Sequence, residues 1–188
     1  MQVKSLKKIF LEFCEVNKLE KNLQQLKIIE LLSDFINPKK KYSNFFFGKK
    51  DKLGFYLFGD VGVGKTMILN LTYNFLDIPK QRYHFNEFMI NFHDYRHANK
   101  SNSILSFVRK LKKKTKLIYL DEFQVTNIVD AMILGKLFET IFNENIKVLI
   151  TSNTKIDDLY KEGLQREQFH PFISIIKKNS IQKQLIIN

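Results

Sequence analysis

The stretch GDVGVGKT, at residues 59–66, has the residue types and the spacing of a phosphate-binding loop. It matches the pattern G-x-x-x-x-G-K-[ST], in which glycines let the backbone curl so that successive N–H groups point at a phosphate. The helix that follows such a loop adds its positive end. A plain glycine turn between a strand and a helix is the alternative. We predict that nucleotide phosphates bind at Gly59, Asp60, Val61, Gly62, Val63, Gly64, Lys65 and Thr66.

Two side chains of this loop have specific chemistry. Lys65 can reach the β- and γ-phosphates of a nucleotide, and the hydroxyl of Thr66 can coordinate Mg²⁺. The motif requires a strand before it and a helix after it. An apolar strand predicted at 54–59 and a helix predicted from Lys65 to about residue 76 meet that requirement.

Two adjacent acids, Asp121 and Glu122, follow an apolar run at 117–120. We predict that Asp121 orients a hydrated Mg²⁺ opposite the phosphate loop, and that Glu122 is the general base for in-line attack of water on the γ-phosphate. A core position is unfavourable for them, because burying an unpaired carboxylate is costly. A solvated strand end or a helix cap is the alternative. The pair favours hydrolysis of ATP over phosphoryl transfer to a small molecule.

The stretch KVLITSNTKID, at residues 147–157, has two interpretations. Its T-K-x-D end is a variant of the element that reads guanine in GTPases. A GTPase also needs a D-x-x-G switch, and the sequence from Asp121 to Gln124 has no glycine. We therefore favour ATP and predict that Asn153, at the end of a strand beside that of Asp121, hydrogen-bonds the attacking water or the γ-phosphate. Capping of the next helix by Asn153 is the alternative.

Arg166 is one of only four arginines in a chain that is rich in lysine. In ring-forming ATPases an arginine near this point enters the neighbouring subunit's site and neutralises charge in the transition state. Lysine cannot copy the bidentate grip of arginine on phosphate. We predict that Arg166 is such an arginine finger, with a plain surface arginine as the alternative.

Strands and helices must position these residues, and the sequence predicts them as short apolar runs that alternate with stretches of helical periodicity. Further strands are predicted at 82–86, 116–121, 147–153 and 181–188. Further helices are predicted over 87–113 with a break near HANKSN (97–102), at 126–143 and in a short stretch that ends near 166. This order predicts an α/β P-loop NTPase fold, a three-layer αβα sandwich around a mostly parallel five-stranded sheet, with ligands at the carboxyl ends of the strands.

Two amphipathic helices are predicted ahead of the first strand, near 3–19 and 23–35, ending before Asn37-Pro38. A basic connector with three consecutive phenylalanines follows. We divide the chain into an N-terminal helical segment with this connector, at 1–44, and a P-loop ATPase domain at 45–188.

The composition is that of a soluble globular protein of 188 residues, with a formal net charge of +12. We interpret this charge mainly as a solvated surface, with nucleic-acid binding as a minority possibility. Cys14 is the only cysteine, which excludes an internal disulfide and fits a reducing cytosol. Neither a signal peptide nor an apolar run long enough to span a bilayer is expected, so we predict a cytoplasmic protein.

The segments YLFGDVGVGKTM, HFNEFM, LDEFQVTNIVDAMIL and TSNTKIDDLYKEGLQREQFHPFI closely resemble the ZapE family of ATPases, with its mitochondrial AFG-one-like relatives, over residues 24–188. The resemblance implies an AAA+ P-loop fold, Mg²⁺-dependent ATP hydrolysis and a ring-type homo-oligomer. It implies a protein partner, since bacterial members are linked to cell division and FtsZ and mitochondrial members to protein quality control. It suggests a location in the bacterial cytoplasm, at the division site.

By the same resemblance, residues 59–66 bind nucleotide, Asp121 and Glu122 are the metal and catalytic acids, Asn153 matches the sensor asparagine and Arg166 matches the arginine finger. Family members continue into a lid, whereas this sequence ends at Asn188, so we expect a short member that lacks the lid and turns over slowly.

Two other functions stay open at this point. One is a nucleic-acid-associated ATPase of the helicase-loader type, which would use the basic run at 109–116 and the connector. The other is a weakly hydrolysing, nucleotide-dependent interaction module. His84 and Glu87 of HFNEFM, together with His93 beyond it, could suggest a metal site, but a strand end with packed aromatic side chains is the simpler interpretation. We expect His84 to pack and Glu87 to start the following helix.

Overall fold

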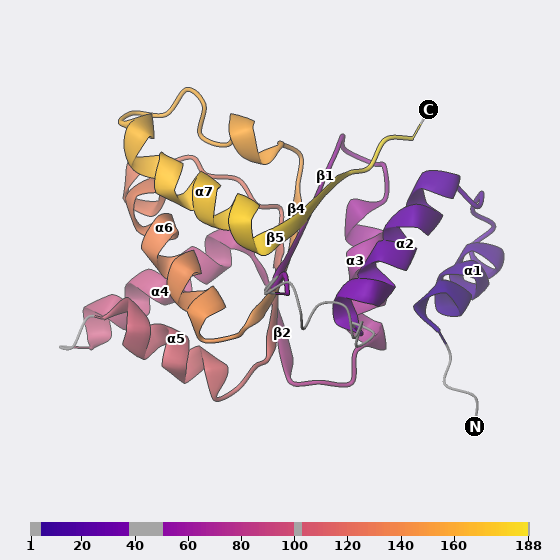
Figure 1. The fold of residues 1–188 in the computed structure, drawn as a ribbon, viewed down its shortest axis with the longest axis horizontal. Helices are drawn as coiled ribbons and strands as arrows, with labels where there is room; N and C mark the ends of the chain where they lie inside the picture. The colour runs from indigo at the N-terminus through magenta and orange to yellow at the C-terminus, as the bar shows by residue number, and fades with distance from the viewer. Residues whose placement is uncertain (1–4, 38–50, 100–102, 188) are drawn as a thin grey trace, which may run out of the picture.

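A parallel five-stranded sheet forms the centre of the computed structural model, which describes residues 5–37, 51–99 and 103–187 (Figure 1). Its strand order is β2-β3-β4-β1-β5, and each pair of neighbours is parallel. The strands are β1 (Gly54–Phe58), β2 (Lys80–His84), β3 (Leu117–Asp121), β4 (Lys147–Ser152) and β5 (Ser180–Gln184). The predicted fold class is confirmed.

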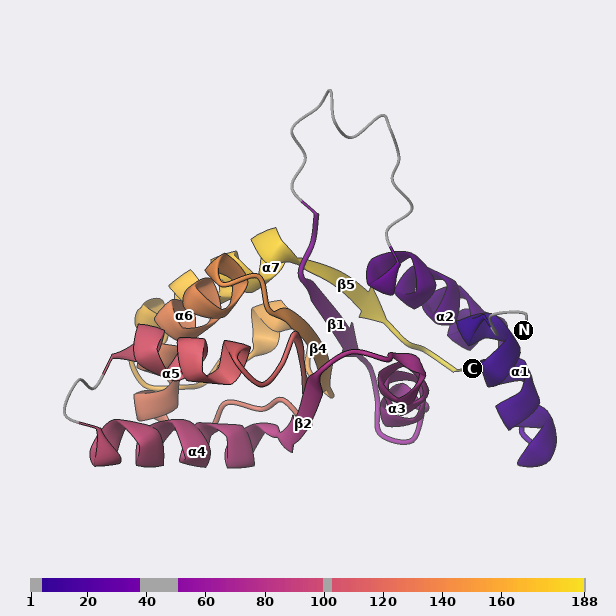
Figure 2. The same ribbon diagram turned by 90° about the horizontal axis from the view of Figure 1, so that it is seen from below.

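Helices cover both faces of the sheet and make a three-layer sandwich (Figure 2). One layer holds α1 (Leu6–Val16), α2 (Leu23–Ile36) and α3 (Lys65–Phe75). The other holds α4 (Phe85–Ala98), α5 (Ile104–Lys112), α6 (Ile128–Asn143) and α7 (His170–Asn179), with the 3-10 helices η2 (Ile156–Asp158) and η3 (Arg166–Phe169). In the part of the chain that the structure describes, none of the helices has the length and apolar character needed to cross a membrane.

Alternation along the strands builds two hydrophobic cores. Phe55, Tyr119 and Leu149 belong to the core under α1, α2 and α3, while Tyr56 and Ile118 belong to the core on the other face. Because both faces of the sheet are covered, the three central strands β1, β3 and β4 are nearly continuous buried runs, whereas the edge strands β2 and β5 are polar and partly exposed. The polar residues of the candidate site lie at or just after the carboxyl ends of these buried strands.

The N-terminal helices are part of the sandwich. Phe10 of α1 and Leu32 of α2 are fully buried in the same core as the sheet residues. Ser5 and Asn22 cap the two helices with their side chains, and α2 ends at Ile36, as predicted. The division at residue 44 and the connector fall outside the described residues.

The structure corrects three expected elements. The final strand, expected at 181–188, ends at Gln184. The second strand starts at Lys80 and ends at His84, so Phe85 and Asn86 belong to α4 rather than to the strand. A single helix near 166 was expected, but two 3-10 helices occupy this region. The stretch after them, which the periodicity left unassigned, is α7.

The reason for α7 is tertiary packing. Phe172 and Ile176 are fully buried and lie one helical turn apart, and α7 packs along α6. Phe172 contacts Phe123 and Phe138 ring to ring. Phe172, Ile173 and Ile176 have helical spacing, but an apolar run this short is ambiguous between a helix and a strand in the sequence alone.

Candidate active site

The phosphate loop connects the end of β1 to the first residue of α3, which is Lys65, as predicted. All three glycines in it have backbone conformations that other residues rarely adopt: φ is 153° at Gly59, 86° at Gly62 and 91° at Gly64, the N-cap of α3. A Cβ atom at Gly59 would also lie 2.3 Å from the carbonyl oxygen of Leu185. The glycines are therefore required by the path of the backbone.

Lys65 lies inside this loop and is only 7% exposed. Its ammonium donates hydrogen bonds to the carbonyl oxygens of Gly59 at 2.9 Å and Asp60 at 2.6 Å. Burial lowers the pKa of Lys65, and the nearby carboxylates of Asp60 and Asp121 oppose this shift. An ammonium has three N–H donors, so these two bonds leave one for a phosphate oxygen.

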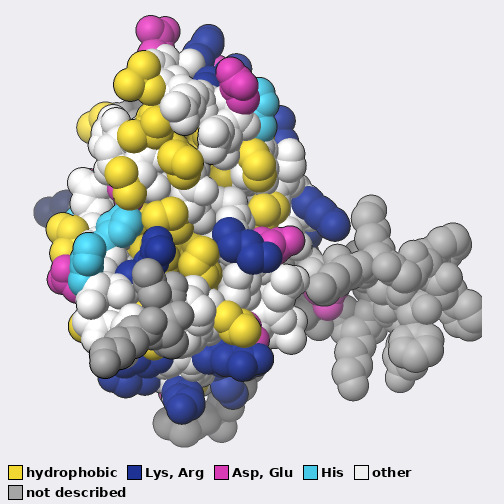
Figure 3. All heavy atoms as spheres, turned by 90° about the vertical axis from the view of Figure 1, so that its left-hand side faces the viewer, with side chains coloured by type: hydrophobic (Ala, Val, Ile, Leu, Met, Phe, Trp, Pro, Cys, Tyr) yellow, Lys and Arg dark blue, Asp and Glu magenta, His cyan; other side chains and the backbone are white. Residues whose placement is uncertain are grey.

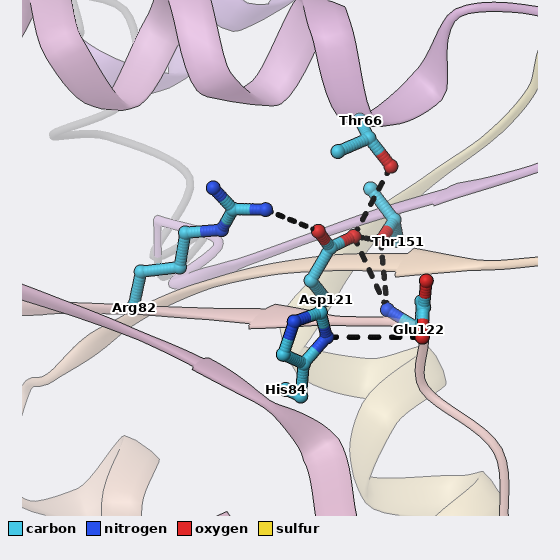
Figure 4. Close-up of polar contacts among 6 residues, drawn as sticks. All are labelled: Thr66, Arg82, His84, Asp121, Glu122 and Thr151. Atoms are coloured by element: carbon cyan, nitrogen blue, oxygen red, sulfur yellow. Dashed lines mark hydrogen bonds and ion pairs between the residues drawn. The ribbon is translucent and has the colours of Figure 1, made fainter. Parts of the chain in front are cut away.

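Most of the polar contacts in this site are made to the carboxylate of Asp121 (Figure 4). Its Oδ1 accepts hydrogen bonds from Thr66 Oγ1 at 3.2 Å, from the Glu122 backbone N–H at 3.2 Å and from the hydroxyl of Thr151. Its Oδ2 accepts a hydrogen bond from Arg82 Nη2 at 2.6 Å. Burial acts to raise the pKa of Asp121, but the bonds from Thr151 and Arg82 outweigh it, and the pKa lies below its ordinary value.

These donors fit a magnesium ion. The hydroxyl of Thr66, at the start of α3, and the carboxylate of Asp121, at the end of β3, lie 3.2 Å apart and are both hard oxygen ligands. Mg²⁺ is usually held by one or two such side chains together with waters and substrate phosphates. The lowered pKa keeps Asp121 ionised, as a metal ligand must be.

Glu122 points away from this cluster although it follows Asp121 directly. Its φ is 55°, in the left-handed region, and its backbone N–H donates to Asp121 Oδ1 and to Thr151 Oγ1 at 3.1 Å. This conformation is unfavourable for a residue with a side chain, and such strain gathers at functional sites. The turn leaves the Glu122 side chain 78% exposed at the edge of the site.

His84 does not pack, contrary to our expectation. Its side chain is 61% exposed, and Nδ1 lies 3.7 Å from Glu122 Oε2. The cause is the register of two parallel strands, which places His84 beside Asp121 at the carboxyl end of the sheet. Glu87 lies in the first turn of α4, as expected, and His93 bonds Asp130 at 2.7 Å.

Asn153 follows the last residue of β4, which is the neighbour of β3, as predicted. It lines a cavity of about 310 Å³ together with Lys65, Thr66 and Glu122. The residues lining this cavity are Val61, Gly62, Lys65, Thr66, Glu122, Phe123, Gln124, Thr151, Ser152, Asn153 and Thr154. The N-cap of the following helix η2 is Lys155, so Asn153 does not cap it.

Arg166 lies away from this cavity. It begins η3, and its Nη2 donates to the carbonyl oxygen of Asp157 at 2.5 Å. It is not among the residues that line the cavity. The structure therefore brings together the phosphate loop, Asp121, Glu122 and Asn153, and leaves Arg166 apart within the same chain.

Sequence patterns missed two residues of the site, Arg82 and Thr151. Arg82 lies in β2 and Thr151 in β4, the two strands that flank β3. Their proximity to Asp121 depends on strand order, which the sequence does not encode locally. A rare arginine in a lysine-rich chain was the only available signal for Arg82.

Known proteins resemble this chain over most of its length. The AFG1-like ATPase family matches residues 9–182. Lactation elevated protein 1 homolog B of Danio rerio is 41% identical over 139 residues, and the match covers 66% of this chain and 28% of that protein. The cell division protein ZapE of Escherichia coli K12 is 39% identical over 129 residues, with 67% of this chain and 34% of that protein covered.

The chain thus spans about a third of the length of these curated relatives. Among solved structures, the DnaC helicase loader has a TM-score of 0.61 at 16% identity, covering 88% of this chain and 92% of that one. At that identity the similarity supports the fold alone. The family match extends over nearly the whole sequence and includes the phosphate loop, the acidic pair and Asn153, and the chain therefore belongs to the AFG1-like ATPase family.

Proposed function

We propose that this chain binds ATP with Mg²⁺ and hydrolyses it to ADP and phosphate. The observation that carries the proposal is the 3.2 Å approach of the Thr66 hydroxyl to Asp121 Oδ1, across the gap between α3 and β3. Glu122 and Asn153 line the same cavity. A phosphate loop, a metal carboxylate, a second acid and a neutral amide together are the set that hydrolysis needs.

Each residue has a separate task in this proposal. The N–H groups of residues 59–66 and the ammonium of Lys65 hold the phosphates, and Thr66 and Asp121 hold the metal. Bound Mg²⁺ supplies positive charge to the β- and γ-phosphates. Glu122 accepts a proton from the attacking water while the water oxygen forms a bond to the γ-phosphorus. The bond between the γ-phosphorus and the oxygen that bridges it to the β-phosphate breaks, and ADP leaves. Asn153 orients the water.

The contacts of residues 154–157 support ATP over GTP. Asp157, which would have to read guanine, is engaged through its carboxylate by Lys177. The carbonyl oxygen of Thr154 accepts a hydrogen bond from Tyr56 at 2.7 Å. Only Thr154 of these four residues lines the cavity. Competition of ATP and GTP for the same site tests this preference directly.

The assembly in this proposal is a homo-oligomeric ring. Arg166 lies outside its own chain's cavity, as an arginine that serves a neighbouring subunit must. The partner is a protein. One relative is named a cell division protein, which supports a role in division. FtsZ as the partner, and protein quality control as a second candidate role, rest only on the family resemblance.

A nucleic-acid-associated ATPase is the competing proposal. The net charge of +12 favours it, and Lys and Arg side chains gather toward the lower edge of the face in Figure 3. However, two members of the basic run at 109–116 are engaged by an acid: Arg109 and Lys112 both contact Glu144. Binding to single-stranded DNA that falls steeply with salt would support this alternative.

ATPase activity measured against protein concentration, with particle size measured with and without ATP, tests the main proposal. We expect specific activity to rise with concentration as particles grow, because neighbouring subunits complete each site. If the protein binds nucleotide but does not hydrolyse it at any protein concentration, the result would support the nucleotide-dependent interaction module instead of an ATPase. Absence of nucleotide binding would overturn the proposal.

A further inference from the structure

Arg82 is the cation nearest to the proposed metal carboxylate. Its Nη2 lies 2.6 Å from Asp121 Oδ2, and its guanidinium lies 5.1 Å from the centre of the Tyr119 ring. Strand register produces both contacts, since Arg82 pairs with Tyr119 across the β2–β3 ladder and Asp121 lies two residues further along. The aromatic face and the carboxylate together fix the direction of the side chain.

The two oxygens of Asp121 therefore have different surroundings. Oδ1 faces the hydroxyls of Thr66 and Thr151, on the side of the phosphate loop, while Oδ2 faces Arg82 (Figure 4). Asp121 is only 2% exposed, so solvation by bulk water stabilises its charge little. Hydroxyl groups supply dipoles but no net positive charge. A buried carboxylate without a counter-charge is strongly unfavourable, and Arg82 provides that charge.

We propose that Arg82 is a positioning residue that holds Asp121 with Oδ1 toward Thr66 and acts as its counter-charge when no metal is bound. A Mg²⁺ held by Thr66 and Asp121 would then share this carboxylate with Arg82. The metal-free protein depends on Arg82 more than the metal-loaded protein does, because a bound Mg²⁺ supplies the positive charge itself. This inference rests on the proposed function for the identity of the metal.

Thermal unfolding tests the pair without using activity. Arg82→Gln keeps a polar side chain but removes the charge, and Arg82→Lys keeps the charge but loses the planar contact with Tyr119. Without ligand, we expect Arg82→Gln to lower Tm by about 3–8 °C and Arg82→Lys to lower it by less. In an Asp121→Asn background, Arg82→Gln should have little further effect.

The second arm adds Mg²⁺ with ADP, or ADP with EDTA. We expect Mg²⁺ with ADP to raise the Tm of Arg82→Gln by more than it raises the Tm of the wild type. With ADP and EDTA, the change in Tm should be the same in both proteins. Arg109→Gln, which removes the same charge beside Glu144, is the matched control and should show the wild-type increase.

Three outcomes would overturn the inference. An unchanged Tm in Arg82→Gln, or an equal loss in the Asp121→Asn background, would show that the pair carries no charge stabilisation. If Arg82→Gln lowers Tm but Mg²⁺ with ADP raises its Tm only as much as that of the wild type, Arg82 has a purely structural role. If Mg²⁺ and ADP leave the wild-type Tm unchanged, the proposed function fails, and the ligand-free comparison still decides whether Arg82 supports Asp121.

Discussion

The hydroxyl of Tyr56 donates a hydrogen bond to the carbonyl oxygen of Thr154 at 2.7 Å. Tyr56 is fully buried in the middle of β1, so this bond ties a rigid strand to the loop that follows β4. Asn153 is the first residue of that loop and lines the cavity. The position of Asn153 therefore depends on a residue that does not itself touch the cavity.

Tyr56→Phe should separate positioning from binding. The change keeps the ring but leaves the Thr154 carbonyl without its donor, which should lower the free energy of unfolding by about 1 kcal/mol. We expect turnover to fall more than nucleotide affinity, because Asn153 becomes less well placed. Denaturant unfolding and single-turnover hydrolysis measure the two effects. Tyr160→Phe removes a similar bond, to the Leu164 carbonyl at 3.0 Å, from an exposed site and should change neither. Equal effects in both variants would argue against this account.

Lys65→Ala should abolish nucleotide binding. It removes the buried ammonium that lies between the carbonyls of Gly59 and Asp60, and we expect Kd for ATP to rise by about 100-fold or more. Lys136→Ala, in an exposed pair with Glu139, is the control for loss of a positive charge. Titration calorimetry distinguishes them, and retained affinity in Lys65→Ala would exclude residues 59–66 as the phosphate site.

Glu122→Gln should keep ATP binding and stop hydrolysis. The amide preserves the shape of the side chain but cannot accept the proton of water, so we expect turnover to drop by about 100-fold to 10,000-fold. Glu162→Gln, on an exposed stretch, serves as the matched control. Equal turnover in Glu122→Gln and the wild type, measured as released phosphate, would remove Glu122 as the general base.

Arg166→Ala should cut turnover by about 1000-fold only if subunits share sites. Mixing it with the Glu122→Gln variant should then restore part of the activity, since some sites combine an intact Glu122 with an intact Arg166 from the neighbour. Arg109→Ala is the control for loss of an arginine elsewhere. No recovery on mixing, despite ATP-dependent oligomers, would contradict an arginine that acts across the interface.

Local patterns predicted the parts of the site that are contiguous in the chain. The phosphate loop, the start of α3 at Lys65 and the placement of Asp121 at the end of β3 all follow from short motifs with apolar runs beside them. Strand spacing was also enough to predict a parallel sheet, because helices must connect parallel strands. These features depend on neighbours within a few residues, which a sequence displays directly.

The sequence predictions were incomplete or wrong where contacts between residues far apart in the chain determine the local conformation. The helix α7 forms because Phe172 and Ile176 find a partner in α6, and β2 ends at His84 because its register follows β3. His84 was expected to pack, yet the end of the sheet places it in solvent beside Glu122. The end of β2 and the exposure of His84 have no signal in the local residue pattern.

The sequence by itself determined which residue types the candidate site contains: a glycine loop with Lys65 and Thr66, then acids at 121 and 122 after an apolar strand. The tertiary structure decided which charged and polar side chains contact one another. Strand order places Arg82 and Thr151 on opposite sides of Asp121, and the left-handed turn at Glu122 separates two adjacent acids into a buried one and an exposed one. The physical reason is that hydrogen bonds and ion pairs act over a few ångströms, and only folding brings residues 39 or 30 positions apart within that range.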